Sequence, residues 1–536
     1  MRTEDGRVTT DGTRIVATLA RHLAETSKLP LTEAAATDHL CAATTGRVPA
    51  TTAASVGSPT IPPEEITKAL TQTPSGKSPG PDGIPADLYR ELASTFAPAF
   101  QALFETILRD GAPPGFNDGL VVTLYKKKGD PLSPGNYRPI TLLNTDYKLF
   151  AKVFANRLIP ALDPLVNQEQ TAFLPGRYIG NNVRLLRELQ AWAATHELGL
   201  GTVLCDFAKA YDTVSRDTLR RLFQTVGLAA AEPFLAVLMT NTTSRCHANG
   251  YLSRRFSLEA GVRQGCPASP LIYLVLAYAL HCHLRGTRLG PTLFVVDTAT
   301  RSCKPRLQVG PQFADDLDAL IRTRSQIPRF LEGMQQFAAA TGQHLNVAKT
   351  QLLYLGHPDY APPGPTEHGL AVMPASTTVL GTPLGNPPAA FWTDKVAATV
   401  AEAHRAPRYV HVRQGPGRQH LRLCSRSLPD GLPPPAIRHR RHPRCSSPAA
   451  HQRHGPDQLP EVPRLQAGDP ERQPTARRLR AAPPAGPPAG AADQAGRHRP
   501  VGPRHPLGRP APGPALRSDA QGRQLAQPRR RCRSHG

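Results

Sequence analysis

Residues 312–321 read QFADDLDALI, and two adjacent carboxylates, Asp315 and Asp316, stand between apolar runs. A strand-like approach ends at Phe313 and a second apolar run covers 317–321, so the pattern predicts the tip of a β-hairpin. Adjacent aspartates repel each other and are costly to desolvate, and a fold that places them between strands normally neutralises them with a divalent cation. A metal site is the first hypothesis, and a solvated turn is the alternative.

A second acidic stretch lies upstream, where residues 203–212 read VLCDFAKAYD. Here too a short apolar run ends in an aspartate, Asp206, as expected of a strand that delivers this carboxylate to one end of a sheet. Two such strands side by side would bring Asp206, Asp315 and Asp316 to one place. The second stretch therefore favours the metal site over the solvated turn.

Three stretches of the chain carry more specific patterns, and they occur in a fixed order. Residues 206–212 (DFAKAYD) resemble motif A of reverse transcriptases, residues 263–270 (RQGCPASP) resemble motif B, and residues 313–316 (FADD) resemble motif C. Upstream, residues 77–85 (KSPGPDGIP) and 136–143 (NYRPITLL) resemble the start of the fingers in enzymes of non-LTR retrotransposons, the long-interspersed-element kind.

This resemblance covers roughly residues 60 to 400. It implies an α+β chain with the right-hand polymerase fold, in which fingers and palm are present and the thumb is incomplete. The alternation of strands with longer helices agrees with an α+β palm. We expect a poorly structured segment at 1–60, a helical lead into the fingers at 61–120, fingers and palm at 121–400, and a separate tail at 401–536.

The resemblance implies an RNA-directed DNA polymerase, which joins dNTPs to a primer 3′-hydroxyl on an RNA template. The implied cofactor is a pair of Mg²⁺ ions about 4 Å apart, with Mn²⁺ as an alternative. Asp206 would bridge both ions and Asp315 would be the second ligand. Asp316 would be a weaker or outer ligand, and the backbone carbonyl of Phe207 would add another.

The resemblance also implies nucleotide-binding residues. Lys126 and Arg138 belong to the predicted hairpin of the fingers, where cations can neutralise a triphosphate. A solvated turn is the alternative for the charged run that begins at Lys126. Tyr211 lies five residues after Asp206, where the family places an aromatic ring under the sugar that excludes a 2′-hydroxyl. A core tyrosine is the alternative.

Three further residues complete the implied nucleotide site. Gln264 and Gly265 would let the backbone approach the nucleotide and the template closely, which a glycine permits. Lys349 lies in a stretch that resembles motif D and would protonate the leaving pyrophosphate, or it is a surface lysine. Asp212 and Asp318 are interpreted as structural.

Composition changes abruptly after Tyr409. From there on the chain has no Phe, Trp, Tyr, Met, Lys or Asn, and Ile437 is its one isoleucine. So few large apolar residues cannot bury enough surface to fold, and we expect a disordered Pro/Arg-rich tail. The missing residues are mostly those with A/T-rich codons, so a frameshift near residues 403–409 is one hypothesis and a genuine Pro/Arg-rich tail is the other.

Net charge divides unevenly between these two parts. Residues 410–536 hold 24 arginines and 7 acidic residues, and so carry +17 of the formal net charge of +23. The preceding part of the chain retains +6, which is compatible with a groove that follows a phosphate backbone.

Cysteine spacing and hydropathy bear on the cellular location expected for the protein. The nine cysteines form no CxxC pair, and the N-terminus does not read as a signal peptide, so we expect an intracellular protein with reduced cysteines, in nucleus or cytoplasm. The longest apolar run, 271–280, is about half the length of a membrane span, so no membrane association is expected.

Other functions remain open at this point. The expected partners are an RNA template and a DNA primer, and nothing in the sequence indicates a protein partner. A reverse transcriptase of the group II intron kind, or a domesticated one, is an alternative of the same class. The alternative of another class is an inactive, truncated retroelement remnant that at most binds nucleic acid.

Overall fold

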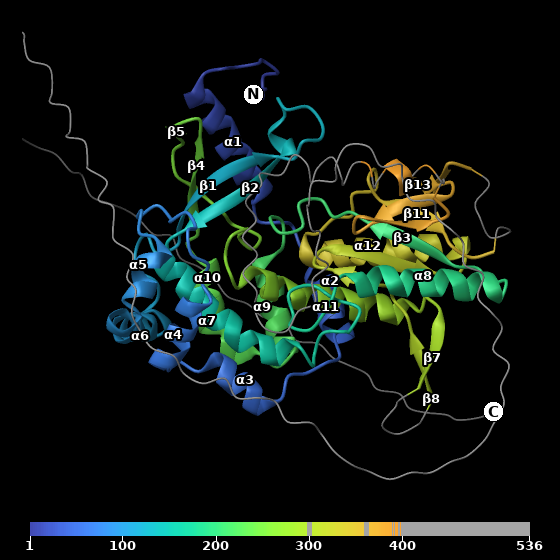
Figure 1. Cartoon of the computed structure of the whole chain (residues 1–536), viewed down its shortest axis with the longest axis horizontal. Helices are drawn as coiled ribbons and strands as arrows, with labels where there is room; N and C mark the ends of the chain where they lie inside the picture. Colours follow the sequence, from blue (N-terminus) through green and yellow to red (C-terminus); the bar gives the residue numbers. More distant parts are fainter. Residues whose placement is uncertain (297–302, 358–363, 388–389, 391, 395–396, 398–536) are drawn as a thin grey trace, which may run out of the picture. The chain divides into compact units, whose positions relative to one another are not determined.

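Strand β3 (Gly201–Cys205), which ends next to Asp206, lies inside a six-stranded sheet. The strand order is β12-β13-β11-β3-β10-β9 (Figure 1). Strands β10 and β11 flank β3 in antiparallel orientation, and β13 runs parallel to β11. The other strands of this sheet are β9 (Gln312–Phe313), β10 (Asp316–Ile321), β11 (Gln351–Tyr354), β12 (Thr366–Glu367) and β13 (Leu370–Met373).

The computed structural model describes residues 1–296, 303–357, 364–387, 390, 392–394 and 397. All of them belong to one compact unit, Met1–Pro416. The tail expected at 401–536, the frameshift hypothesis and the incomplete thumb therefore lie outside the described residues.

Alternating side chains give the six-stranded sheet two apolar faces. Val203 and Leu352 belong to the main core, together with residues of helices α11 and α12. Leu320 and Leu353 belong to a second cluster, together with residues of helix α8. Burying each such side chain contributes roughly 1.5–3 kcal/mol, so helices on both faces hold the sheet in place. These helices are α8 (Gly180–Thr195), α11 (Ser269–Thr287) and α12 (Ile327–Thr341).

A second sheet of five strands contains the predicted hairpin before Arg138. Its strand order is β2-β1-β4-β5, with β6 also paired to β4, and helix α1 lies beside it (Figure 1). Strands β1 and β2 are antiparallel, and β1 and β4 are parallel. The bounds are β1 (Asp118–Tyr125), β2 (Tyr137–Leu143), β4 (Thr243–Ala248), β5 (Tyr251–Leu252) and β6 (Phe256–Ser257).

Four phenylalanine rings in contact with one another pack between the helices beside the second sheet. Phe104, Phe150, Phe234 and Phe154 follow one another with ring centroids 5.4, 5.3 and 4.8 Å apart. Aromatic pairs at this spacing add to the hydrophobic gain of burial. The helices of this region are α4 (Pro63–Thr71), α5 (Ala86–Glu91), α6 (Ala93–Asp110), α7 (Thr145–Leu162), α9 (Arg216–Thr225) and α10 (Glu232–Met239).

The N-terminal 60 residues differ from the prediction of a poorly structured segment. They contain helices α1 (Gly12–Thr26), α2 (Ala34–Ala43) and α3 (Ala50–Gly57). Their Thr- and Ala-rich sequence has few large apolar residues, so the helical pattern is faint. Leu40 and Val56 are buried against the main core, and such tertiary packing stabilises helices of weak propensity.

Two small hairpins complete the described structure. One is formed by β7 (Thr292–Val296) and β8 (Cys303–Leu307), and it projects from the body (Figure 1). The other is formed by β14 (Ser376–Val379) and β15 (Thr382–Gly385). With helices and largely antiparallel sheets together, the predicted α+β class is confirmed.

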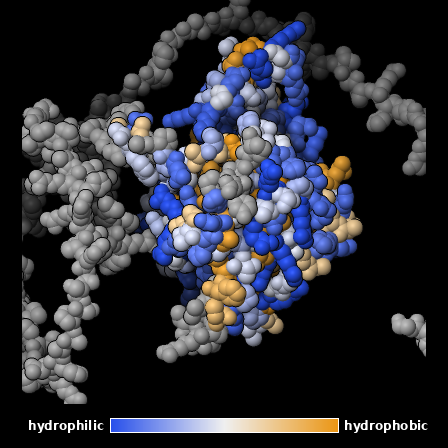
Figure 2. Space-filling model, turned by 90° about the vertical axis from the view of Figure 1, so that its right-hand side faces the viewer, coloured by the Kyte–Doolittle hydropathy of each residue, from blue (hydrophilic) through white to orange (hydrophobic). Residues whose placement is uncertain are grey.

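The described helices are too short or too polar to cross a lipid bilayer. On the face drawn in Figure 2, hydrophilic side chains predominate and hydrophobic ones occur in small groups. Such scattered groups are ordinary for a protein surface.

Candidate active site

Two neighbouring strands bring the predicted aspartates to one end of the six-stranded sheet. Leu317 of β10 is the register partner of Cys205 of β3, so one step further along the sheet Asp316 faces Asp206. Phe313 of β9 pairs with Asp316, which leaves Asp315 in the tight turn of the predicted hairpin. The hairpin tip and the strand end inferred from sequence are therefore present and adjacent.

Burial and neighbouring charge raise the proton affinity of the two aspartates of the hairpin, Asp315 and Asp316. Burial raises the pKa of Asp315, and the charge of Asp206 raises it further. Burial raises the pKa of Asp316 to about 6, with additional repulsion from Asp315 and Asp206. Each effect disfavours the charged form, so a cation placed among these oxygens would be stabilising.

A short segment of backbone fixes the chain next to Asp206. Phe207 bridges to Leu345: the Ala208 N–H donates to the His344 carbonyl (2.9 Å), and the Asn346 N–H donates to the Asp206 carbonyl (2.7 Å). In an antiparallel pair of this kind the residue between the two bonds points its own carbonyl the other way. The Phe207 carbonyl is therefore directed away from this partner, as a metal ligand would need to be.

No three His, Cys, Asp or Glu side chains converge into a ready-made metal centre within the residues that the structure describes. The available donors at the strand ends are hard carboxylate and carbonyl oxygens. Mg²⁺ prefers such oxygens, keeps several waters, and is held in nucleotide-handling sites by one or two carboxylates plus substrate phosphates. The donor set fits Mg²⁺ in that open mode.

Basic side chains gather beside the aspartates. Burial lowers the pKa of Lys126, and the charges of Lys209, Lys349 and Arg138 lower it further. Burial also lowers the pKa of Lys209. The Lys349 Nζ lies 3.9 Å from the Asp206 Oδ2, which links the basic group to the acidic one.

Lys209 also belongs to this basic group, although it was not among the residues predicted from the sequence. It lies between Asp206 and Tyr211, in a backbone conformation with φ of 56° that side chains seldom adopt. The nearby Asp212 is half-buried, and desolvation raises its pKa to about 6 although Lys209 and Lys126 act in the opposite direction. A lysine inside motif A was the signal that could have identified it.

Tyr211 lies half-buried at the same end of the sheet. Its ring stacks on Tyr273 of α11, with centroids 4.7 Å apart and an interplanar angle of 14°. Burial raises the pKa of Tyr211, and the nearby charge of Asp315 adds to the shift. The ring is thus held flat by its neighbour, within electrostatic reach of the aspartate turn.

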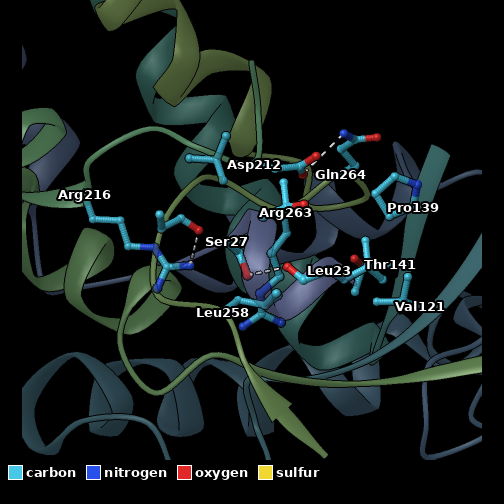
Figure 3. Close-up of a pocket in the computed structure, with 13 residues that line it drawn as sticks. Leu23, Ser27, Val121, Pro139, Thr141, Asp212, Arg216, Leu258, Arg263 and Gln264 are labelled. Carbon is cyan, nitrogen blue, oxygen red and sulfur yellow. Dashed lines mark hydrogen bonds between the residues drawn. The ribbon is translucent and has the colours of Figure 1, made fainter. Parts of the chain in front are cut away.

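The motif B segment lies against strand β2 (Figure 3). The Gln264 side chain points toward Asp212, with its Nε2 3.5 Å from the Asp212 Oδ1, and its backbone carbonyl accepts a hydrogen bond from the Thr141 N–H (2.8 Å). Gly265 has a φ of 126°, and a Cβ there would clash with the Thr141 carbonyl. Only glycine fits this contact between the segment and β2.

A comparison with known protein families agrees with this geometry. Residues 125–384 match the family model described as "Reverse transcriptase (RNA-dependent DNA polymerase)". The chain carries a reverse transcriptase domain. This domain includes both strand ends with aspartates, the motif B segment and the segment that contains Lys349.

Several curated proteins resemble the reverse transcriptase domain. They include the "Transposon TX1 uncharacterized 149 kDa protein" of Xenopus laevis, 29% identical over 303 residues. A retrovirus-related Pol polyprotein from a type-1 retrotransposable element R2 of Popillia japonica is 28% identical over 231 residues. A probable RNA-directed DNA polymerase from transposon BS of Drosophila melanogaster is 26% identical over 285 residues.

These matches cover 56%, 42% and 51% of the chain, but only 23%, 31% and 29% of the relatives' own length. The chain therefore spans less than a third of each of these relatives. The resemblance to reverse transcriptases of non-LTR retrotransposons, predicted from five short stretches, is confirmed.

Proposed function

We propose that the chain is an RNA-directed DNA polymerase of a non-LTR retrotransposon. It extends a DNA primer 3′-hydroxyl with dNTPs on an RNA template. The observation that carries this proposal is the register of β3 and β10, which brings Asp206 together with Asp315 and Asp316. The match of the reverse transcriptase domain and the printed names of its relatives support it.

The six-stranded sheet with its helices is the palm in this proposal, and the five-stranded sheet with the β1–β2 hairpin belongs to the fingers. Helices α4, α5 and α6 form the lead into the fingers at 61–120, and fingers and palm extend over 121–400. Helices α1 to α3 at the N-terminus pack on both parts. Hairpin β14–β15 follows the palm in the chain and corresponds to the stretch before a thumb.

Asp206, Asp315, Asp316 and the Phe207 carbonyl hold Mg²⁺ in this proposal. When bound there, Mg²⁺ would supply Lewis-acid chemistry, activation of the primer hydroxyl and stabilisation of the charge on the leaving pyrophosphate. The raised pKa values of Asp315 and Asp316 support the assignment, because carboxylates crowded in this way gain most from a bound cation. Mn²⁺ accepts the same oxygen donors and is an expected substitute.

Lys126, Lys209, Arg138 and Lys349 contact the triphosphate of the incoming nucleotide. Their crowding supports this role, since a polyanion relieves the repulsion that lowers the pKa of Lys126. Lys349 already lies next to Asp206, and it is placed to give a proton to the leaving pyrophosphate.

Tyr211 forms the floor under the sugar and excludes a 2′-hydroxyl, which makes dNTPs the substrates. Its stacking on Tyr273 supports this role, because a ring held rigidly can reject an extra atom. Gln264 and Gly265 place the motif B backbone beside the nucleotide and the template. The close packing of Gly265 on Thr141 keeps that segment joined to the fingers.

Primer extension by the full chain tests this function. The substrate is poly(rA)·oligo(dT) with labelled dTTP and Mg²⁺, and Asp315→Ala is the inactive variant. Asp217→Ala, which removes an exposed aspartate on α9, is the matched control. We expect extension by the wild type and by the control, and none by Asp315→Ala. Absence of extension by folded wild-type protein would contradict the proposal and favour an inactive remnant.

A further inference from the structure

A glutamine far from the aspartates in sequence contacts the turn that carries them. Gln170 is completely buried, and its side-chain amide bonds both backbone groups of Ala314, which is 144 residues away. The Gln170 Nε2 donates to the Ala314 carbonyl (3.1 Å), and the Ala314 N–H donates to the Gln170 Oε1 (3.0 Å). The same Oε1 accepts from the Ala172 N–H (3.2 Å).

Gln170 is itself held firmly by the neighbouring backbone. Strand β9 runs alongside it: the Gln312 N–H donates to the Glu169 carbonyl (2.9 Å), and the Thr171 N–H donates to the Gln312 carbonyl (3.0 Å). The Glu169 carboxylate in turn accepts a hydrogen bond from Arg306 of β8 (2.8 Å). The glutamine therefore projects from a short strand-like segment that cannot shift independently of the hairpin.

The backbone conformation of Ala314 is unfavourable, and the hydrogen bonds of the Gln170 amide stabilise it. Its φ is 58°, in the left-handed region that alanine rarely occupies, and the residue is buried at the tip of a two-stranded turn. A strand neighbour cannot pair with a residue in a turn, so the Gln170 amide takes the place of that neighbour. Asp315 follows directly, and the peptide plane of Ala314 sets the direction of its carboxylate.

We infer that Gln170 is a positioning residue for the aspartate turn: by bonding both backbone groups of Ala314 it holds Asp315 and Asp316 in the orientation that synthesis requires. This inference rests on the proposed polymerase function. Gln170 touches neither substrate nor metal in this role. The Gln170 amide is buried and directed into the protein.

The test compares two buried amides in the full chain. Gln170→Met keeps the length of the side chain and removes all three hydrogen bonds. Asn117→Leu is the matched control, because the buried Asn117 amide donates to the Val237 and Thr240 carbonyls (2.7 and 2.8 Å), away from the aspartates. Each variant is assayed for kcat and KM by primer extension with varied dTTP and Mg²⁺. Hydrogen exchange of the segment 312–317 is measured by mass spectrometry.

We expect Gln170→Met to lower kcat roughly 10- to 100-fold, because small displacements of catalytic groups have effects of this size, while KM for dTTP changes little. The Mg²⁺ concentration for half-maximal rate should rise, and exchange in 312–317 should become faster. Asn117→Leu should show neither change, whatever its loss of thermal stability. Equal kcat and equal Mg²⁺ dependence in the two variants would overturn the inference.

The same experiment gives a different result if the proposed polymerase function is wrong. If the folded wild type extends no primer, the polymerase proposal is contradicted. Hydrogen exchange still tests whether the Gln170 amide stabilises the turn at Ala314. Faster exchange of 312–317 in Gln170→Met alone would then support the positioning of the turn by Gln170. Unchanged exchange would overturn that as well.

Discussion

Two charged groups flank the chain segment between Asp206 and Asp212, and they respond to burial in opposite ways. In the acidic group, Asp315 and Asp316 have raised pKa values because partial desolvation and neighbouring carboxylates disfavour their charged forms. In the basic group, partial burial lowers the pKa of Lys126 and of Lys209, and neighbouring cations lower the pKa of Lys126 further. The pair Lys349 and Asp206, 3.9 Å apart, connects the two groups.

The difference separates this site from an ordinary ion-pair network. In a stabilising network, opposite charges alternate and each partner favours the charged form of the other. Here carboxylates collect on one side and lysines on the other, with Asp212 as the one carboxylate noted among the lysines, so a ligand of opposite sign would stabilise each group. A divalent cation suits the acidic side and a triphosphate suits the basic side, as nucleotide polymerisation requires.

The largest effect is expected when the acidic group is broken. Asp206→Ala removes the carboxylate opposite Asp316, so DNA synthesis should fall at least about 1,000-fold, since metal-assisted charge stabilisation is worth several kcal/mol. Thermal stability without metal should stay equal or rise, because a repelling charge is gone. Primer extension and thermal unfolding measure the two quantities. Retained synthesis would refute the metal assignment.

The second-largest effect is expected when the Tyr211 ring is removed, and it concerns the discrimination between deoxyribonucleotides and ribonucleotides. Tyr211→Ala should reduce the discrimination against ribonucleotides roughly 10- to 100-fold, since rejection of one hydroxyl by shape is worth about that much. Competition between dTTP and UTP in primer extension measures the ratio. Tyr211→Phe keeps the ring stacked on Tyr273 and serves as the control. Unchanged discrimination in Tyr211→Ala would show that the ring is a packing residue.

The basic group should respond through substrate affinity. Lys126→Met should raise KM for dTTP roughly tenfold with a smaller change in kcat, because a charge-assisted hydrogen bond contributes about 1.5–3 kcal/mol. Lys68→Met, at an exposed position on α4, is the control for loss of one positive charge. Steady-state kinetics with varied dTTP provides the measurement. An equal KM in both variants would remove Lys126 from the nucleotide site.

The smallest effect concerns stability alone. Burial raises the pKa of Asp318 from 3.8 to about 7, with a further contribution from Asp316. Between these values the unfolded chain releases a proton that the folded chain keeps, so Asp318 lowers stability progressively as pH rises. Asp318→Asn does not titrate and escapes this loss.

The melting temperature of Asp318→Asn should therefore exceed that of the wild type by an amount that grows from about pH 4 to about pH 7 and reaches a few degrees. Thermal unfolding of both proteins across this range measures the difference. Taking the difference cancels the contributions of the histidines, which are shared. A difference independent of pH would contradict the raised pKa.

Some of the site was accessible from local sequence pattern. The hairpin tip at Asp315 and the strand end at Asp206 both follow from apolar alternation that stops at a carboxylate, which is a short-range signal. Gly265 was expected to allow a close backbone approach to the nucleotide and the template, and the contact that the structure shows there, with the Thr141 carbonyl, was not foreseen. Lys209 was missed although it lies within motif A, because its neighbours in space come from β1 and from the segment of Lys349.

The N-terminal helices also depend on contacts with distant residues, which local sequence pattern does not reveal. Helix α1 begins at Gly12, and the side chain of its N-cap Asp11 accepts hydrogen bonds from the Thr13 and Arg14 N–H groups. Helices α2 and α3 were not expected, since their sequences have weak amphipathic patterns. They are stable because Leu40 and Val56 reach the core of the domain, and that contact depends on distant residues.

The amino-acid sequence by itself determined the family, the α+β class and the three carboxylates, because these depend on short motifs and on periods of two and of about four residues. Tertiary structure decided which charges meet. It placed Asp206 opposite Asp316, collected the lysines beside them, and directed the Gln170 amide to a backbone 144 residues away. Burial and proximity set pKa values and hold strained turns, and neither is encoded in the spacing of neighbouring residues.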